Sequence, residues 1–175
     1  MPADTQQTKG KSLYLPMKAR ITRAEQLTDL EKFFEIELLN GETLSYLPGQ
    51  FVEVSVFGYG EVPISISSPP TKPGGFELCV RKVGKVTAAL HSLEKGSIIG
   101  IRGPFGNGFN TQDLKKKDLL FIGGGIGLVP LRSLIKYVIE HKKDYGKITI
   151  LYGAKTPAEL LFRDELKQWE SEEGI

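Results

Sequence analysis

The sequence predicts two successive folds: an all-β antiparallel domain, and after it an α/β domain of the Rossmann-like, nucleotide-binding type. Short apolar segments separated by turn residues run from Met17 to about Gly103, with the spacing of a small barrel or sandwich. From Leu119 onward, apolar strand patterns alternate with amphipathic helix patterns, as in a parallel sheet. We place the segments as follows: a polar, mobile tail at 1–12, a β domain at 13–110, a charged linker at 111–117 and an α/β domain at 118–175.

Six strands and one short helix are expected in the β domain. The strands are expected near 13–21, 33–39, 51–57, 64–67, 76–81 and 97–102, and the helix at 87–93. In the fifth strand, Phe76, Leu78 and Val80 should share one face, with Glu77, Cys79 and Arg81 on the other, because strand side chains alternate.

The α/β domain is organised around a strand, a glycine turn and a helix. An apolar strand at 119–122 leads into Gly123-Gly-Gly-Ile-Gly127, and a helix with one apolar face follows Pro130. Glycines allow close backbone approach, and a helix start offers unpaired N–H groups to an anion such as a pyrophosphate. The dinucleotide fingerprint would need a third glycine where Leu128 stands, so a tight turn without ligand is an equal alternative from this pattern alone.

A second strand and helix complete the predicted α/β pattern. The strand is expected at 148–152, and Thr156-Pro-Ala-Glu159 has the pattern of a capping box that opens a helix ending near Gly174. A mononucleotide-binding half needs at least one more strand. We therefore expect the chain to be a fragment whose next strand would start at Ile175.

Two motifs of the β domain could bind a ligand. Pro63-Ile-Ser-Ile-Ser-Ser68 alternates apolar and hydroxyl side chains, which suits the faces and edge of a flat heteroaromatic ring. Val83-Gly-Lys-Val-Thr87 leads into a helix for which Thr87 is the expected N-cap, so it offers an anion site. The alternatives are an ordinary exposed strand and an ordinary capped helix.

Composition narrows the functional classes. The net charge of +2 gives no strong attraction to nucleic acid, and the apolar runs are too short for a membrane span. The single cysteine, Cys79, excludes an internal disulfide and a cysteine metal cluster within these 175 residues, and it favours a cytoplasmic location. His91 and His141 are expected to be solvated, Cys79 an ordinary strand residue and Trp169 a core residue, so no acid–base triad is predicted.

Six motifs occur in an order that resembles the ferredoxin–NADP reductase superfamily of flavoproteins. They are Leu47-Pro-Gly-Gln-Phe-Val52, Pro63-Ile-Ser-Ile-Ser67, Val83-Gly-Lys-Val-Thr87, Gly103-Pro-Phe-Gly-Asn-Gly108, Gly123-Gly-Gly-Ile-Gly127 and Tyr152-Gly-Ala154. Within the superfamily the chain looks most like the electron-transfer subunits of multisubunit enzymes. These are the gamma subunits of NAD(P)-linked hydrogenases and the electron-transfer subunits of anaerobic sulfite reductase and of dihydroorotate dehydrogenase.

The resemblance implies a six-stranded Greek-key barrel that binds FAD and an α/β domain that binds NAD(P)H. By position, Ser65 would lie near flavin N5, Gly84 and Thr87 would hold the pyrophosphate of FAD, and the glycine turn would face the nicotinamide nucleotide. The full set of implied cofactor-binding residues is Pro63, Ile64, Ser65, Ile66, Val80, Arg81, Lys82, Gly84, Val86, Thr87, Gly124, Gly125, Ile126, Gly127, Gly153 and Lys155.

Two departures from the superfamily pattern qualify the resemblance. Val62 and Ile64 stand where an arginine and often an aromatic residue occur, so Arg81 or Lys82 is expected to neutralise the phosphates. The cysteine-rich motif for a [2Fe-2S] cluster is expected only in a C-terminal segment beyond this chain. Lys155 after the second strand would favour NADPH, with a solvated loop charge as an equal alternative.

The predicted function is that of a flavoprotein electron-transfer subunit. It would pass electrons between NAD(P)H and an iron–sulfur partner subunit through FAD, with the redox chemistry supplied by the flavin. No nucleic acid partner and no membrane insertion are expected. The alternatives are a single-component reductase that uses FMN or FAD, and a non-catalytic, nucleotide-sensing interaction module.

Overall fold

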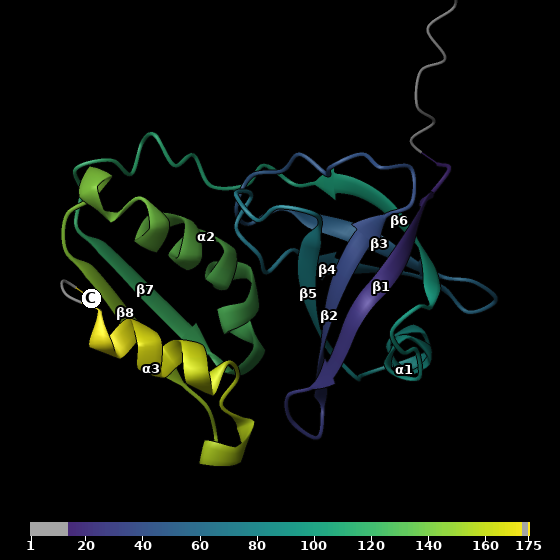
Figure 1. Ribbon diagram of the computed structural model, residues 1–175. Helices are drawn as coiled ribbons and strands as arrows, with labels where there is room; N and C mark the ends of the chain where they lie inside the picture. Colours follow the sequence, from purple (N-terminus) through teal and green to yellow (C-terminus); the bar gives the residue numbers. More distant parts are fainter. Residues whose placement is uncertain (1–13, 173–174) are drawn as a thin grey trace, which may run out of the picture.

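The computed structural model describes residues 14–172 and residue 175, and it places a curled β-sheet beside a small α/β region (Figure 1). The predicted tail at 1–12 and the predicted helix end at Gly174 lie outside the described residues. The segment boundaries set from the sequence at 110 and 118 remain a prediction.

Six antiparallel strands form the sheet of the β region, as the sequence predicts. They are β1 (Met17–Gln26), β2 (Glu31–Leu38), β3 (Phe51–Val56), β4 (Gly60–Ser65), β5 (Phe76–Arg81) and β6 (Ile98–Phe105), in the order β4-β3-β6-β1-β2-β5. The predicted barrel is not closed, because β4 and β5 are the two edges of the sheet. They meet at an isolated bridge between Ile66 and Leu78, and α1 (Lys85–His91) contacts both edge strands.

The alternation predicted for β5 is confirmed, and it explains where the two regions touch. Leu78 and Val80 are buried in the core of the sheet, against residues such as Phe34. Cys79, on the opposite face of the strand, packs in a second apolar cluster with Val129 and Leu161 of the α/β region. The two faces of β5 therefore belong to two different apolar clusters, and the Cys79 cluster joins the β region to the α/β region.

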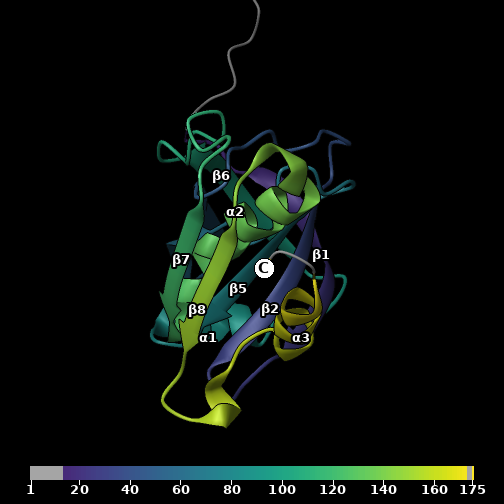
Figure 2. The same ribbon diagram turned by 90° about the vertical axis from the view of Figure 1, so that its left-hand side faces the viewer.

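The α/β region is built on two parallel strands, β7 (Leu119–Gly124) and β8 (Ile148–Gly153), which lie side by side in Figure 2. Its helices are α2 (Leu128–Glu140) and α3 (Arg163–Ser171), and short 3-10 turns lie at Gly125–Gly127, Lys142–Asp144 and Pro157–Glu159. Both helices pack on one face of the strands, in a core that holds Phe121, Ile135, Ile148 and the predicted core residue Trp169. Leu120, Ile122 and Leu151 point to the opposite face and are exposed.

The structure corrects two predicted helix starts. The first helix begins at Lys85 after an N-cap at Gly84, so Thr87 is its third residue and not its cap. Thr156 opens only a 3-10 turn, and its hydroxyl donates to the Glu159 carboxylate at 3.1 Å without a capping bond to a backbone N–H. α3 starts after Phe162, whose backbone is left-handed with φ 52°.

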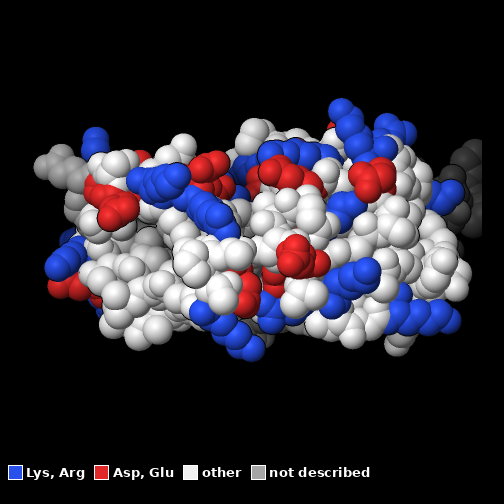
Figure 3. All heavy atoms as spheres, turned by 90° about the horizontal axis from the view of Figure 1, so that it is seen from below, with Lys and Arg blue, Asp and Glu red and all other residues white. Residues whose placement is uncertain are grey.

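Charges on the described surface are mixed. In the view from below, cationic and anionic side chains alternate over both regions, without a large patch of one sign (Figure 3). Within residues 14–172, no helix has the length and apolar character required to span a bilayer.

Candidate functional site

The glycine turn lies at the carboxyl ends of two neighbouring parallel strands. Gly124 at the end of β7 is in register with Gly153 at the end of β8. The turn Gly125–Gly127 leads directly into α2. Tyr152 ties these segments together, because its hydroxyl donates to the Gly125 carbonyl at 3.1 Å and accepts the Leu161 N–H at 3.2 Å. In open α/β sheets, ligands bind at this end of the strands.

Most glycines of this turn are not required by the fold itself. A Cβ added at Gly124, Gly127 or Gly153 would meet no atom within 4 Å. Gly124 has φ −129° and Gly127 has φ −62°, which any residue adopts. Only Gly125, with φ +52°, needs its conformational freedom. The open space in front of these backbones fits close approach by a ligand, as the predicted dinucleotide site requires.

The loop before α1 has the same property. Gly84 has φ −154° and no atom within 4 Å of an added Cβ. The Thr87 hydroxyl accepts the N–H groups of Val83 and Gly84, both at 2.9 Å, and donates to the Gly84 carbonyl at 3.0 Å. Thr87 therefore orders the loop from within, and the amides left without intrahelical partners are those of the first helical turn.

Ser65 lies on the outer face of the sheet with two aromatic rings. Phe51 is the cross-strand partner of both Ser65 and Phe105, and the two rings are 5.8 Å apart between centroids. Directly opposite residues share a face. Neither ring was predicted from the sequence to line a site, although Phe51 lies in the motif Leu47–Val52 and Phe105 in the motif Gly103–Gly108.

The apolar side chains of the Pro63–Ser68 motif do not lie beside its hydroxyls. Ile64 packs against the core and Ile66 is fully buried, because alternate strand residues point to opposite faces. Val80 is also a core residue. The predicted alternation is therefore confirmed, with the isoleucines directed to the core and Ser65 to the opposite face. Ile66 and Val80 could contact a ligand only through their main chain.

The remaining predicted cofactor residues are spread over both regions. Pro63 is exposed, and Val86 of α1 lies 3.3 Å from a Cβ added at Gly60. Ile126 packs against the cluster of Cys79, Val129 and Leu161. Lys82 and Lys155 are exposed.

Arg81, expected to neutralise the phosphates of FAD, has a partner of its own. Its Nε donates to the carboxylate of Glu31, which is 2% exposed. Its Nη2 lies 3.8 Å from a Cβ added at Gly125, whereas a Cβ at Gly84 would have no neighbour within 4 Å. The guanidinium therefore faces the glycine turn of the α/β region, not the Gly84 loop.

His91 and Cys79 do not form a reactive site. The expectation that His91 is solvated is wrong, because the residue is half-buried and its Nε2 lies 2.8 Å from the Val80 carbonyl oxygen. Burial lowers the pKa of His91. Burial also raises the pKa of Cys79 to about 12, so its thiol is not a nucleophile at neutral pH. Within the described residues, no cluster of histidine, cysteine and acidic side chains could hold a metal ion.

Two cavities lie outside the two glycine loops. One of about 400 Å³ lies between the two regions, lined by residues that include Phe33, Arg132 and Phe162. Another of about 510 Å³ lies at the start of β1 and the end of β6, and Phe105 is one of its lining residues. Neither of these two cavities is lined by a described residue that was predicted to bind FAD or NAD(P)H.

Comparison with known families matches each region to a cofactor class. Residues 18–109 match the oxidoreductase FAD-binding domain family, and residues 121–174 match the oxidoreductase NAD-binding domain family.

Two relatives extend this match. The chain is 44% identical over 156 residues to sulfhydrogenase 2 subunit gamma of Pyrococcus furiosus, covering 87% of this chain and 54% of the relative. It is 36% identical over 148 residues to a probable dihydroorotate dehydrogenase B (NAD(+)) electron transfer subunit of Archaeoglobus fulgidus, covering 83% of this chain and 56% of the relative. The chain thus spans about half the length of these relatives.

Solved structures share the fold at low sequence identity. Ferredoxin-NADP+ reductase from Plasmodium falciparum superposes with a TM-score of 0.76 at 22% identity, covering 89% of this chain and 65% of that one. Phthalate dioxygenase reductase superposes with a TM-score of 0.78 at 18% identity, covering 89% of this chain and 50% of that one. The six-stranded antiparallel sheet followed by a small α/β region is therefore the arrangement found in these reductases.

Proposed function

Because the chain belongs to the oxidoreductases that carry an FAD-binding domain, we propose that it is a flavoprotein electron-transfer subunit. It would pass electrons from NAD(P)H to an iron–sulfur partner. The observation that carries the proposal is the pair of glycine sites, Gly84 in the β region and Gly124 in the α/β region. At both positions the φ angle is one that any residue adopts, and an added Cβ would meet no atom within 4 Å. A side chain would therefore fit, and its absence leaves open space for a ligand.

The residues that would hold FAD lie at the open edge of the sheet. The amides at the start of α1 would bind the pyrophosphate, with Gly84 allowing its approach and Thr87 fixing the loop. The Ser65 hydroxyl would bind the edge of the flavin ring. Phe51 and Phe105 supply apolar surface on the same face.

The residues that would hold the dinucleotide lie at the ends of β7 and β8. The N-terminus of α2, behind the glycine turn, would bind its phosphates, and Gly153 would allow approach from the second strand. Arg81 lies beside Gly125 and would add a positive charge. Lys155 has no acidic neighbour in sequence until Glu159, which is consistent with NADPH as well as NADH.

Bound FAD would supply the redox chemistry, namely hydride acceptance from the nicotinamide and release of single electrons. This chain would bind and orient the two nucleotides, and no protein acid or base is assigned. The matched relatives are named as subunits of a sulfhydrogenase and of a dihydroorotate dehydrogenase, which supports a partner subunit. We propose that the acceptor is an iron–sulfur centre and that any [2Fe-2S] motif lies outside residues 1–175. The free, buried thiol of Cys79 is compatible with the cytoplasm as the location.

The proposal is tested by nucleotide binding to the purified protein. FAD, FMN and ADP-ribose are titrated separately, with flavin fluorescence and calorimetry as readouts. We expect tight binding of FAD, weaker binding of FMN because it lacks the pyrophosphate, and independent binding of ADP-ribose. Equal affinity for FMN would remove the α1 loop from the site, and the absence of flavin binding would contradict the proposal.

A further inference from the structure

The two edges of the sheet meet beside the candidate flavin-binding strand. β4 ends at Ser65, and the next residue forms the bridge between Ile66 and Leu78. The Ser67 N–H then donates to the Glu77 carbonyl at 2.9 Å. We call residues 66–68 together with Glu77 the seam. The backbone that follows Ser65 leaves the strand, and single hydrogen bonds hold it within the β region. The Ile66 N–H donates to the Gln50 carbonyl at 3.0 Å, and the Glu77 N–H donates to the Ser68 hydroxyl oxygen at 2.9 Å.

Helix α2 of the α/β region holds this seam. Arg132 Nη1 donates to the Ser67 carbonyl at 3.0 Å and to the Glu77 carboxylate at 2.6 Å. The Ser133 hydroxyl donates to the Ser68 carbonyl at 2.6 Å. α2 is also the helix that begins directly after the glycine turn. A single rigid element therefore joins the candidate dinucleotide site to the backbone of the candidate flavin site.

Arg132 is itself held in place on every side. Its side chain is 3% exposed, its Nε and Nη2 donate to Glu165 at 2.7 and 2.5 Å, and its guanidinium lies 4.3 Å from the centre of the Phe162 ring. Burial alone would lower the pKa of Arg132, but the Glu165 and Glu77 carboxylates raise it, so the group stays charged. The planar guanidinium makes these contacts at once, which an ammonium group cannot do.

We propose that Arg132, assisted by Ser133, is a positioning residue that sets the separation between the flavin and the nicotinamide. This inference rests on the proposed function. Transfer between two bound groups needs the reacting atoms about 3–3.5 Å apart, and a 1 Å displacement costs about 100-fold in rate. Arg132 would act on that distance without touching either nucleotide.

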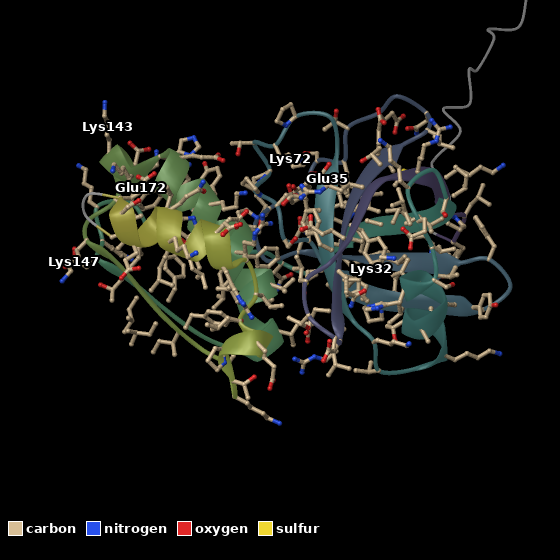
Figure 4. All side chains as sticks on the ribbon, turned by 60° about the horizontal axis from the view of Figure 1, so that its bottom comes forward. Lys32, Glu35, Lys72, Lys143, Lys147 and Glu172 are labelled. Atoms are coloured by element: carbon tan, nitrogen blue, oxygen red, sulfur yellow. The ribbon has the colours of Figure 1, made fainter. Side chains whose placement is uncertain are left out.

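The ion pairs around Arg132 allow its positioning role to be tested without leaving a buried carboxylate unpaired. Glu77 also pairs with Lys72 at 3.4 Å. Lys72 lies 4.0 Å from Glu35, and Figure 4 labels these two residues near each other. Glu165 also pairs with Lys136 at 3.2 Å. Replacing Arg132 with methionine therefore leaves each carboxylate with a lysine, so the charges stay compensated.

The first test needs no cofactor. Amide hydrogen exchange at residues 66–68 is compared in wild type, Arg132→Met, Ser133→Ala and the control Lys136→Met. Lys136 lies on the same helix and binds the same Glu165, but this ion pair does not involve the seam. Arg132→Met should raise exchange at Ser67 about tenfold or more, Ser133→Ala less, and Lys136→Met less than about twofold. Unchanged exchange in both Arg132→Met and Ser133→Ala would overturn the inference.

The second test separates an effect on the relative position of the two nucleotides from an effect on their affinities. Dissociation constants for FAD and ADP-ribose are measured singly, and flavin reduction by NAD(P)H is followed in a single turnover. Arg132→Met should keep both constants within about threefold and slow reduction about 10- to 100-fold, and Arg132→Lys should restore only part of the rate. Should Arg132→Met not fold, Ser133→Ala carries the test, with about threefold slower reduction expected.

The results of these tests separate failure of the role proposed for Arg132 from failure of the proposed function. The inference alone would be overturned if the wild type binds both nucleotides and its flavin is reduced, and if the flavin of Arg132→Met and of Ser133→Ala is reduced at the same rate. A fall in FAD affinity that accounts for the whole loss of rate would also overturn it, because Arg132 would then only stabilise the site. Wild type that binds no flavin would overturn the proposed function and this inference with it.

Discussion

Replacing Gly84 with valine should weaken FAD binding while leaving the fold intact. The residue has extended backbone geometry, with φ −154° and ψ −174°, and an added Cβ would meet no atom within 4 Å. Valine therefore fits without a clash. Glycine is a better N-cap than valine, so we expect a loss of about 0.5–1 kcal/mol in the free energy of unfolding.

The effect on FAD follows from the contacts that the side chain would block. A branched side chain at position 84 would occupy the space through which a pyrophosphate reaches the first amides of α1. One hydrogen bond to a charged group contributes about 1.5–3 kcal/mol. Its loss corresponds to about a 10- to 150-fold rise in the dissociation constant. Titration of flavin fluorescence, with thermal unfolding of the same samples, measures both quantities.

Gly124→Val is the matched control for this prediction. Gly124 is also extended, with φ −129° and ψ 128°, and a Cβ there is equally unobstructed. It lies in the glycine turn, so valine there should weaken ADP-ribose and spare FAD. The reasoning is refuted if Gly84→Val keeps wild-type FAD affinity, or if both variants weaken both ligands equally.

Three further changes test the loop, the dinucleotide site and the charge pairs of the sheet. Thr87→Ala leaves two amides of the loop without their partner and should cost about 1–3 kcal/mol in chemical denaturation; an unchanged midpoint would contradict the loop geometry. Lys155→Glu should raise the KM for NADPH above that for NADH, and a constant ratio would show that Lys155 does not contact the 2′ position. The hydrogen bond from Arg102 lowers the pKa of Glu61 from 4.5 to about 2. That contribution to stability is complete above pH 4.5 and is lost as pH falls through 2, so Arg102→Ala should flatten the acid unfolding profile over this range.

Local patterns predicted the six strands of the sheet and the strand–turn–helix order around the glycine turn. The alternation of β5 and the strand–turn–helix order around Gly125 depend on residues close together in the chain, so they can be read from sequence. The capping pattern at Thr156 failed because the left-handed backbone of Phe162 delays the helix, and nothing in the local sequence signals that conformation.

Contacts between distant segments could not be predicted. Phe51, Ser65 and Phe105 share a face because β3 pairs with both β4 and β6, and that register is a property of the whole sheet. Arg81 was assigned to the nearest glycine loop in sequence, whereas its partner Glu31 directs it toward Gly125. No role for the buried Arg132 was predicted from the sequence, because its partners come from β5, the segment after β4, and α3.

The most direct test of the account is reduction of the FAD-loaded protein by NAD(P)H without oxygen. We expect the long-wavelength absorbance of the flavin to bleach on addition of NADPH or NADH and to return when a one-electron acceptor such as ferricyanide is added. Gly124→Val should slow the bleaching at limiting NAD(P)H, and saturating NAD(P)H should restore it. A flavin that stays oxidised while both nucleotides are bound would contradict the claim that the chain brings FAD and NAD(P)H together for electron transfer.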